Sequence, residues 1–443
     1  MTPFTLLARA GATAVALSLA LPAMAQNRID LVRPDAPTLA IHGAYKVGVR
    51  TMELSNPGQL NILGVKDGAR PTYDRPLTVE IWHPATTDQT GGTYDTLLRD
   101  GETHVTITGA AVRDAAPDMT GAPYPLVIIS HGYPGNRILM AHLGESLAAR
   151  GYVAVSIDHT DSLYQDMGNF GSTLVNRPID QMFVLEQMAQ AGAAGGALAG
   201  VVDASKTGLI GYSMGGYGAV ISAGGGISQA GVDLAWGAPE GLAAVNRAGS
   251  DTHEALIDDR LAAVIAIGPW GMELGHYGGT QGFWDAEGLA GVRKPILFMA
   301  GTSDATSIYE TGVKAIYEGS INAPWRGLLS FANAGHNAVA PMPAPMESWA
   351  MSEKLGWAPF EHYADAVWDT TRMNNIAQHF AAAFMDLHLK GDAEMATYLD
   401  LAEDGGAAVF AAEKDGTLKP EHTYWKGFKK GTAAGLSFSS AVK

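Results

Sequence analysis

The pentapeptide Gly211-Tyr212-Ser213-Met214-Gly215 has the residue types and spacing of a tight turn that presents a nucleophilic serine. In the pattern G-x-S-x-G the serine lies between a strand and a helix, and the glycines let neighbouring elements pass close by. An apolar run over 207–210 precedes the pattern, and small residues follow it at 216–220. We therefore expect Ser213 to be a nucleophile. The alternative is a glycine-rich turn whose serine has no chemical role.

An acid should follow the serine in the chain. A serine hydroxyl needs a base, and the base needs an orienting acid; with this pattern the acid comes first and the base second. Asp304 follows the apolar run 296–300, which would put it at the carboxyl edge of a sheet. Its alternative role is to cap a helix over 307–317. Glu273 is the second candidate for the acid.

The favoured base is His336, in Ala334-Gly335-His336-Asn337, just past the apolar run 327–331. A loop at this point would let the imidazole reach over the sheet edge to the serine. Its alternative role is local hydrogen bonding. The other histidines after Ser213 are less favoured. His379 and His388 lie on the last helix and are expected to be structural, and His362 lies in an irregular segment and could line a pocket. The remaining ones are His253, His276 and His422.

The loop 130–135, Ser-His-Gly-Tyr-Pro-Gly, could supply an oxyanion hole. Backbone N–H groups that are fixed in place stabilise a tetrahedral intermediate best. We expect one donor from Met214, next to the nucleophile, and one from Tyr133, since Pro134 has no N–H. The alternative is a purely structural turn. His131 is expected to brace this loop.

Short apolar runs alternate with helical patterns along most of the chain. From residue 126 onward the runs lack polar alternation, which is typical of a sheet buried on both faces. The order predicts an α/β fold with a mostly parallel central sheet and helices on both faces. Helices are expected over 138–150, 179–189 and 375–389. The expected strands are Val47–Leu54, Leu77–His83, Leu126–Ser130, Val153–Ile157, Thr207–Tyr212, Ala262–Ile267, Ile296–Ala300 and Gly327–Phe331.

Residues 26–443 are interpreted as a single domain. Two irregular segments, near 232–256 and 340–370, are expected to be insertions packed over the active-site edge. The small-residue segment 191–200 is expected to be a flexible loop. Trp270 follows a predicted strand, and it would either line an acyl pocket or pack in the core.

Residues 1–25 have the pattern of a secretory signal peptide. Arg9 is the only charged residue, an apolar run extends from Ala10 to Leu21, and Ala23 and Ala25 precede a cleavage point before Gln26. The run is shorter than the ~20 residues that a membrane span needs. The alternatives are an uncleaved anchor and a buried first helix. We expect an exported protein, periplasmic or secreted, with no stable membrane span.

The composition narrows the function classes. The 443 residues include no cysteine, which excludes a disulfide scaffold, a thiolate metal site and a cysteine nucleophile. The formal charge of −16 argues against a nucleic-acid partner. The chemistry outlined above requires no metal and no organic cofactor, and nothing in the sequence indicates the oligomeric state.

With these parts in order, residues 40–440 resemble the α/β-hydrolase superfamily. Three features are similar to the subgroup called predicted dienelactone hydrolases, which is related to platelet-activating-factor acetylhydrolases and to secreted lipase- or cutinase-like polyester hydrolases. They are a front end over 49–51 and 75–84, Ile157-Asp158-His159-Thr160-Asp161 after a strand, and a tail over 374–392. True dienelactone hydrolases use a cysteine, so the subgroup name does not give the substrate.

The resemblance implies hydrolysis of a small-molecule or lipid-like ester by a serine triad, here Ser213, Asp304 and His336, through an acyl-enzyme. Two alternatives stay open. One is a peptidase or amidase with the same triad, and the other is an inactive hydrolase fold that acts as a binding protein. Acyl-chain preference and activity on polymers depend on the shape of the pocket.

Overall fold

The computed structural model describes residues 27–168, 170–273 and 282–443. The predicted signal peptide, residues 1–25, lies outside these ranges, and so does His276. In the described part of the chain, no helix combines the length and apolar character that crossing a bilayer requires.

In the described residues, eleven strands form one sheet, in the order β13-β12-β11-β10-β9-β7-β8-β2-β1-β5, with β6 beside β2. Two further strands, β3 and β4, pair with each other. The strands are β1 (Lys46–Leu60), β2 (Thr72–Thr86), β3 (Gly92–Leu97), β4 (His104–Gly109), β5 (Val112–Arg113), β6 (Ala116–Pro117), β7 (Tyr124–Ser130), β8 (Val153–His159), β9 (Val202–Tyr212), β10 (Leu261–Ile267), β11 (Ile296–Gly301), β12 (Trp325–Phe331) and β13 (Leu436–Val442).

The middle of the sheet is parallel and its margins are antiparallel. Strands β8, β7, β9, β10, β11 and β12 run in one direction. Strand β2 is antiparallel to β8 and to β1, and β13 is antiparallel to β12. This confirms the α/β fold with a mostly parallel sheet. Each of the eight runs expected to be strands lies within a strand of the structure.

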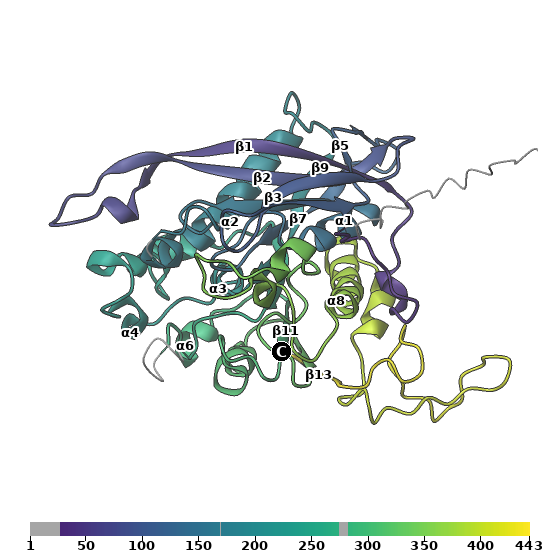
Figure 1. Cartoon of the computed structure of the whole chain (residues 1–443). Coiled ribbons are helices and arrows are strands. Elements are labelled where there is room, and N and C mark those ends of the chain that lie inside the picture. Colours follow the sequence, from purple (N-terminus) through teal and green to yellow (C-terminus); the bar gives the residue numbers. More distant parts are fainter. Residues whose placement is uncertain (1–26, 169, 274–281) are drawn as a thin grey trace, which may run out of the picture.

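Helices cover both faces of the sheet (Figure 1). Alternate strand residues point to opposite faces, so Ile129 and Ile265 pack with α1 and α8, whereas Ile128 and Val264 pack with α2, α3 and α7. The helices are α1 (Ala141–Ala149), α2 (Phe170–Gly192), α3 (Met214–Ser222), α4 (Gln229–Val232), α5 (Asp251–Leu256), α6 (Ala286–Leu289), α7 (Lys314–Gly319) and α8 (Thr370–Met385).

The start, the end and the packing of helix α8 follow from particular residues. Asp369 caps α8 by accepting the N–H of Arg372 at 2.8 Å. A π-turn, Asp386–Lys390, extends the helix, and Gly391 ends it at φ 73°, which a residue without Cβ adopts easily. Phe380 stacks on Phe438 of β13 with ring centroids 5.6 Å apart. The predicted helix over 375–389 is confirmed.

Several elements differ from the sequence-based expectation. Strands β3, β4 and β13 were not predicted. Helix α2 is longer than the predicted 179–189, because Pro178 lies inside it and a proline usually indicates a helix start or break. It ends at Gly192, so only the later part of 191–200 is a loop, and β9 already begins at Val202.

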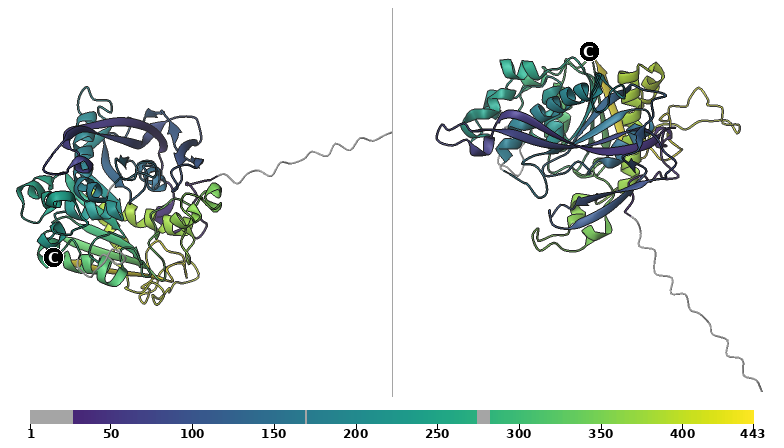
Figure 2. Two further views of the ribbon diagram at one scale, coloured as in Figure 1. Left: turned by 60° about the vertical axis from the view of Figure 1, so that its left-hand side comes forward. Right: turned by 90° about the horizontal axis from the view of Figure 1, so that it is seen from above.

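Two parts of the chain extend away from the sheet at opposite ends of the molecule. The long β1–β2 hairpin projects at one end, and the coil between α8 and β13 projects at the other (Figure 1 and the right-hand view of Figure 2). The segments 232–256 and 340–370 contain only short helical turns besides α5. Their interpretation as insertions in a single domain stays a prediction.

Candidate active site

Ser213 occupies the sharp turn between β9 and α3. Its backbone has φ 52° and ψ −111°, an uncommon conformation for a residue with a side chain. A Cβ atom on Gly211 would lie 2.2 Å from the carbonyl oxygen of Gly215, and one on Gly215 would lie 2.0 Å from that of Ser130. Close backbone contacts therefore require both glycines of the pattern.

The hydroxyl of Ser213 meets the imidazole of His336, which meets the carboxylate of Asp304. Oγ of Ser213 is 2.9 Å from Nε2 of His336, and Nδ1 of His336 is 2.8 Å from Oδ2 of Asp304. The three residues follow β9, β12 and β11, which are parallel and end at the same edge of the sheet. The structure thus brings together the three residues that the sequence analysis favoured.

Asp304 both caps the following turn and contacts the imidazole of His336, which are the two roles considered for it. Oδ1 accepts the N–H groups of Thr306 at 2.8 Å and Ser307 at 2.9 Å, as a capping residue does, and Oδ2 remains for His336. The following helix begins later than predicted, with a π-turn at Tyr309. Burial alone would raise the pKa of the Asp304 carboxyl, but the imidazole and the two N–H groups outweigh it and leave the pKa below its usual value.

The other candidates for acid and base have different partners. Glu273 accepts a hydrogen bond from the hydroxyl of Thr311. Of the described histidines, His253 is buried in α5, His362 bonds the hydroxyl of Tyr164 at 2.9 Å, His379 accepts the N–H of Leu39 at 3.1 Å, His388 lies beside the ring of Phe384, and His422 contacts the backbone of Ala411.

A cavity of about 520 Å³ opens over Ser213 and His336. Part of its wall comes from Arg99, Trp357 and Glu361, which no local motif indicated, and from His362, which was expected to be able to line a pocket. Arg99 follows β3, and three others lie in the segment 340–370; they are Trp357, Glu361 and His362. The fold alone brings these residues to the serine. The cavity is lined by Arg99, Gly132, Tyr133, Pro134, Tyr212, Ser213, Thr306, His336, Asn337, Trp357, Glu361 and His362.

The two expected oxyanion donors flank the serine. Met214 is the first residue of α3, and the first N–H groups of a helix have no partner within the helix. Gly132 lies against the nucleophile, because a Cβ atom placed on it would be 3.2 Å from Cβ of Ser213. Tyr133 follows Gly132 and lines the cavity. His131 donates from Nδ1 to the carbonyl of Gly132 at 2.7 Å, as a bracing residue would.

Trp270 contacts the nucleophile through its backbone. Its N–H donates to the carbonyl of Ser213 at 3.2 Å. Its side chain is 3% exposed, packs against the rings of Phe170 and Phe283, and is not among the residues that line the cavity. This arrangement matches the core-packing alternative, and a role for Trp270 in binding an acyl group stays a prediction.

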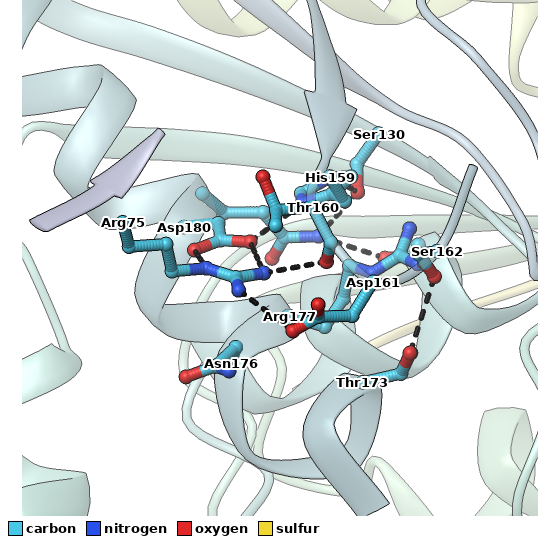
Figure 3. Close-up of polar contacts among 12 residues, drawn as sticks. Arg75, Ser130, His159, Thr160, Asp161, Ser162, Thr173, Asn176, Arg177 and Asp180 are labelled. Atoms are coloured by element: carbon cyan, nitrogen blue, oxygen red, sulfur yellow. Dashed lines mark hydrogen bonds and ion pairs between the residues drawn. The ribbon is translucent and has the colours of Figure 1, made fainter. Parts of the chain in front are cut away.

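A second serine–histidine–aspartate array lies buried beneath the loop that begins at His131 (Figure 3). Oγ of Ser130 is 2.8 Å from Nε2 of His159, and Nδ1 of His159 is 2.9 Å from Oδ2 of Asp180. Arg75 pairs with both oxygens of Asp180, at 2.8 and 3.0 Å. In the sequence, His159 belongs to a segment that carries the family resemblance, and no local pattern relates it to Ser130 or Asp180.

The comparisons with known proteins agree with this fold. Residues 108–246 match the model of a family described as PET hydrolase-like. A cutinase of Thermobifida alba is 33% identical over 95 residues, which are 21% of this chain and 28% of the cutinase. A second cutinase, from Thermobifida cellulosilytica, is 33% identical over 95 residues, 21% of this chain and 32% of that protein. The match therefore spans about a third or less of each relative.

A solved structure of a ferulic acid esterase from Streptomyces cinnamoneus superposes with a TM-score of 0.52 at 21% identity. The superposition covers 83% of this chain and 94% of that one. At this identity the likeness concerns the fold. Together with the sheet order and the turn at Ser213, these findings show that the chain has an α/β-hydrolase fold and that part of it resembles two cutinases and a PET hydrolase-like family.

Proposed function

We propose that this protein hydrolyses carboxylic esters with Ser213 as nucleophile. The observation that carries the proposal is the 2.9 Å contact between Oγ of Ser213 and Nε2 of His336 at the surface of a cavity. The similar proteins named as cutinases and as a ferulic acid esterase support an ester substrate. The triad determines the reaction, and the shape of the cavity determines which acyl and alcohol groups of the substrate fit.

The reaction would begin when Oγ of Ser213 attacks the ester carbonyl carbon and its proton passes to Nε2 of His336. Asp304 would keep Nδ1 of His336 protonated and stabilise the imidazolium that forms. The N–H groups of Tyr133 and Met214 would bind the oxyanion. When the C–O bond breaks, the alcohol would leave with the proton from His336.

Water would then attack the acyl-enzyme. His336 would take a proton from the water as the oxygen adds to the acyl carbon, and it would return that proton to Oγ of Ser213 as the bond to the serine breaks. The products are a carboxylic acid and an alcohol, and the protein is regenerated. Each step uses the side chains and backbone N–H groups described above.

The test is the hydrolysis of p-nitrophenyl esters, from acetate to long acyl chains, by the protein and by its Ser213→Ala variant. We expect turnover that a correctly folded variant loses, and labelling of Ser213 by a fluorophosphonate. Turnover of p-nitroanilides in preference to esters would favour an amidase. A folded protein with neither ester turnover nor labelling would favour a binding role and overturn the proposal.

We further propose that residues 1–25 are removed on export and that residues 26–443 form one domain. The charge and apolar pattern of the leader supports export. Expression with the leader in a bacterial host should give a protein in the periplasm or medium whose N-terminal residue is Gln26. A product that retains Met1 would contradict cleavage. Limited proteolysis should cut near 232–256 or 340–370 without releasing a separately folded fragment.

A further inference from the structure

Helix α2 sends two polar side chains towards the ends of β7 and β9. Arg177 and Gln181 are four residues apart, so they project from the same face of the helix. Both are buried, with 1% and 0% of their surface exposed. They meet the two segments that carry the oxyanion donors of the proposed function, on which the inference below rests.

Arg177 holds the loop that contains Tyr133. Its Nη1 donates to the carbonyl of His131, and its Nη2 lies 3.5 Å from the carbonyl oxygen of Gly132. The same Nη2 donates to Oγ of Ser162 at 2.5 Å. The carbonyl of Gly132 and the N–H of Tyr133 belong to one planar peptide unit. The same carbonyl also accepts from Nδ1 of His131 at 2.7 Å, so Arg177 and His131 together fix the direction in which the N–H of Tyr133 points.

Gln181 connects this loop to the turn of the nucleophile. Its Nε2 donates to Oγ of Ser130 and to the carbonyl of Gly215, both at 3.0 Å. Its Oε1 accepts the hydroxyl of Ser222 at 3.0 Å. Every hydrogen-bonding atom of this amide has a partner, so its orientation is defined. One side chain thus spans the end of β7 and the beginning of α3.

Gly218 makes room for both side chains. A Cβ atom on Gly218 of α3 would lie 2.7 Å from Cγ of Arg177 and 2.8 Å from Nε2 of Gln181. Neither distance is compatible with a real Cβ contact, so a side chain at this position would require Arg177 and Gln181 to shift. Helix α3 is therefore shaped to accept Arg177 and Gln181.

In the part of the chain that the structure describes, no carboxylate forms a direct ion pair with Arg177. Among the described residues, the carboxylates of Asp161 and Asp180 pair with Arg75 rather than with Arg177 (Figure 3). Burial lowers the pKa of Arg177 to about 9, which leaves the guanidinium charged at neutral pH. A cation in a water-excluded site behind the loop would favour negative charge on the oxyanion.

We propose that Arg177 and Gln181 are positioning residues for the oxyanion hole. Arg177 sets the peptide that carries the N–H of Tyr133, and Gln181 sets the distance between that loop and the turn that carries the N–H of Met214. Neither side chain lines the cavity, so neither touches the substrate.

The matched pair of variants is Arg177→Met and Arg150→Met. Arg150 is also a largely buried guanidinium that donates to a backbone carbonyl, that of Leu39. It follows α1 directly before β8, at the edge of the sheet opposite the serine. Both variants lose a buried charge and a hydrogen bond, but only Arg177→Met releases the loop of Tyr133. Arg177→Lys, which keeps the charge and loses the fork of donors, is the conservative variant.

The readouts are kcat, KM and the inhibition constant of phenylboronic acid. Ser213 Oγ would bond to boron, its proton would pass to His336, and one boron hydroxyl would occupy the oxyanion hole. For Arg177→Met we expect kcat to fall about 10- to 100-fold with KM changed less than about twofold, and the inhibition constant to rise by a similar factor. Arg177→Lys should lose about 3- to 10-fold, and Arg150→Met should stay within about twofold.

Three results would overturn the inference, and a fourth would overturn its basis. If Arg177→Met behaves like Arg150→Met, or raises KM alone, then Arg177 has only a structural role. If Arg177→Met does not fold, Arg177→Lys decides in the same way, with unchanged kcat and unchanged boronate binding as the negative result. If the unaltered protein hydrolyses no ester and binds no boronic acid, the proposed function itself fails.

Discussion

The molecule contains two serine–histidine–aspartate arrays with nearly equal spacing and different surroundings. The serine-to-imidazole distances are 2.9 Å for Ser213 and 2.8 Å for Ser130. Ser213 and His336 line a cavity, whereas Ser130 is 0% exposed and is the last residue of β7. Ser213 has φ 52°, in a turn that the close backbone contacts of Gly211 and Gly215 hold in place. The hydrogen-bonding pattern alone therefore does not identify a nucleophile.

The charge around each aspartate differs as well. In the described residues, the ion pair of Asp304 is with His336, and its other partners are backbone N–H groups. Asp180 already has the guanidinium of Arg75, and burial lowers the pKa of its neighbour His159 to about 3. His159 is thus held neutral and is a poor proton acceptor. Access to a cavity and a carboxylate that is not paired with an arginine therefore separate the proposed catalytic array from the buried one.

The largest expected effect distinguishes the two serines. Ser213→Ala should lower kcat by about 10⁴- to 10⁶-fold with little change in stability. Ser130→Ala should keep kcat within about tenfold but lower the free energy of unfolding by about 1–3 kcal/mol, since His159 and Gln181 each lose a buried partner. Ester turnover and urea denaturation of both variants measure this. Loss of turnover in Ser130→Ala as deep as in Ser213→Ala would abolish the distinction.

The two aspartates should separate function from stability. Asp304→Asn should lower kcat by about 10³- to 10⁴-fold, because an amide no longer orients or stabilises the protonated imidazole. Asp180→Asn should cost about 3–5 kcal/mol of stability, since it leaves the buried charge of Arg75 without its main partner. Kinetics and thermal unfolding of the two proteins provide the comparison. A fully stable Asp180→Asn would show that Asp161 suffices for Arg75.

Acid should destabilise the protein through its buried imidazoles. The pKa of His159 is about 3 in the fold and 6.5 ordinarily, so between these values the unfolded chain binds one more proton. The free energy of unfolding should then fall as the pH decreases below about 6.5, by up to about 1.4 kcal/mol per pH unit for each such histidine. His142, His362 and His379 have the same direction. Urea titrations from pH 7 to 4.5 test this, and a flat profile would contradict it.

The smallest effect concerns the ring beside the proposed base. Tyr212 lies against His336 with ring centroids 5.2 Å apart, and its hydroxyl is 3.3 Å from Oδ1 of Asn337. Tyr212→Phe keeps the ring and removes this hydrogen bond, which is worth about 0.5–1.5 kcal/mol. We expect kcat to change less than about threefold. Tyr212→Ala is the matched variant, and an equal effect of both would show that the ring does not support the imidazole.

The central sheet could be predicted because its strands are buried on both faces. Runs such as Leu126–Ser130 are apolar throughout, so they are recognisable without knowledge of their neighbours. Strand β13 was missed because Leu436–Val442 contains three serines and pairs with β12 from far along the chain. Its edge position tolerates polar residues, and only tertiary contacts specify it.

The triad residues could be predicted because each follows a recognisable strand end, and strand ends of a parallel sheet share an edge. The second array could not. Ser130 and His159 come together through the pairing of β7 with β8, and Asp180 arrives on α2. The composition of the cavity wall could not be predicted either. Arg99 and His362 both line the cavity but come from distant parts of the sequence, and no spacing rule relates them. The second array and the cavity wall depend on side-chain packing between distant segments, which local sequence patterns do not predict.

The wall of the cavity and the proposed nucleophile are encoded in separate stretches of the chain. The turn of Ser213 is constrained by Gly211, Gly215 and Gly218, which leave no room for another atom, whereas Arg99 and Trp357 of the cavity wall come from a hairpin and from the segment 340–370. Selection or protein engineering can therefore act on the wall while the turn stays fixed. A library at these wall positions would explore new substrates at little risk to the chemistry, and one at the glycines would yield mostly inactive proteins.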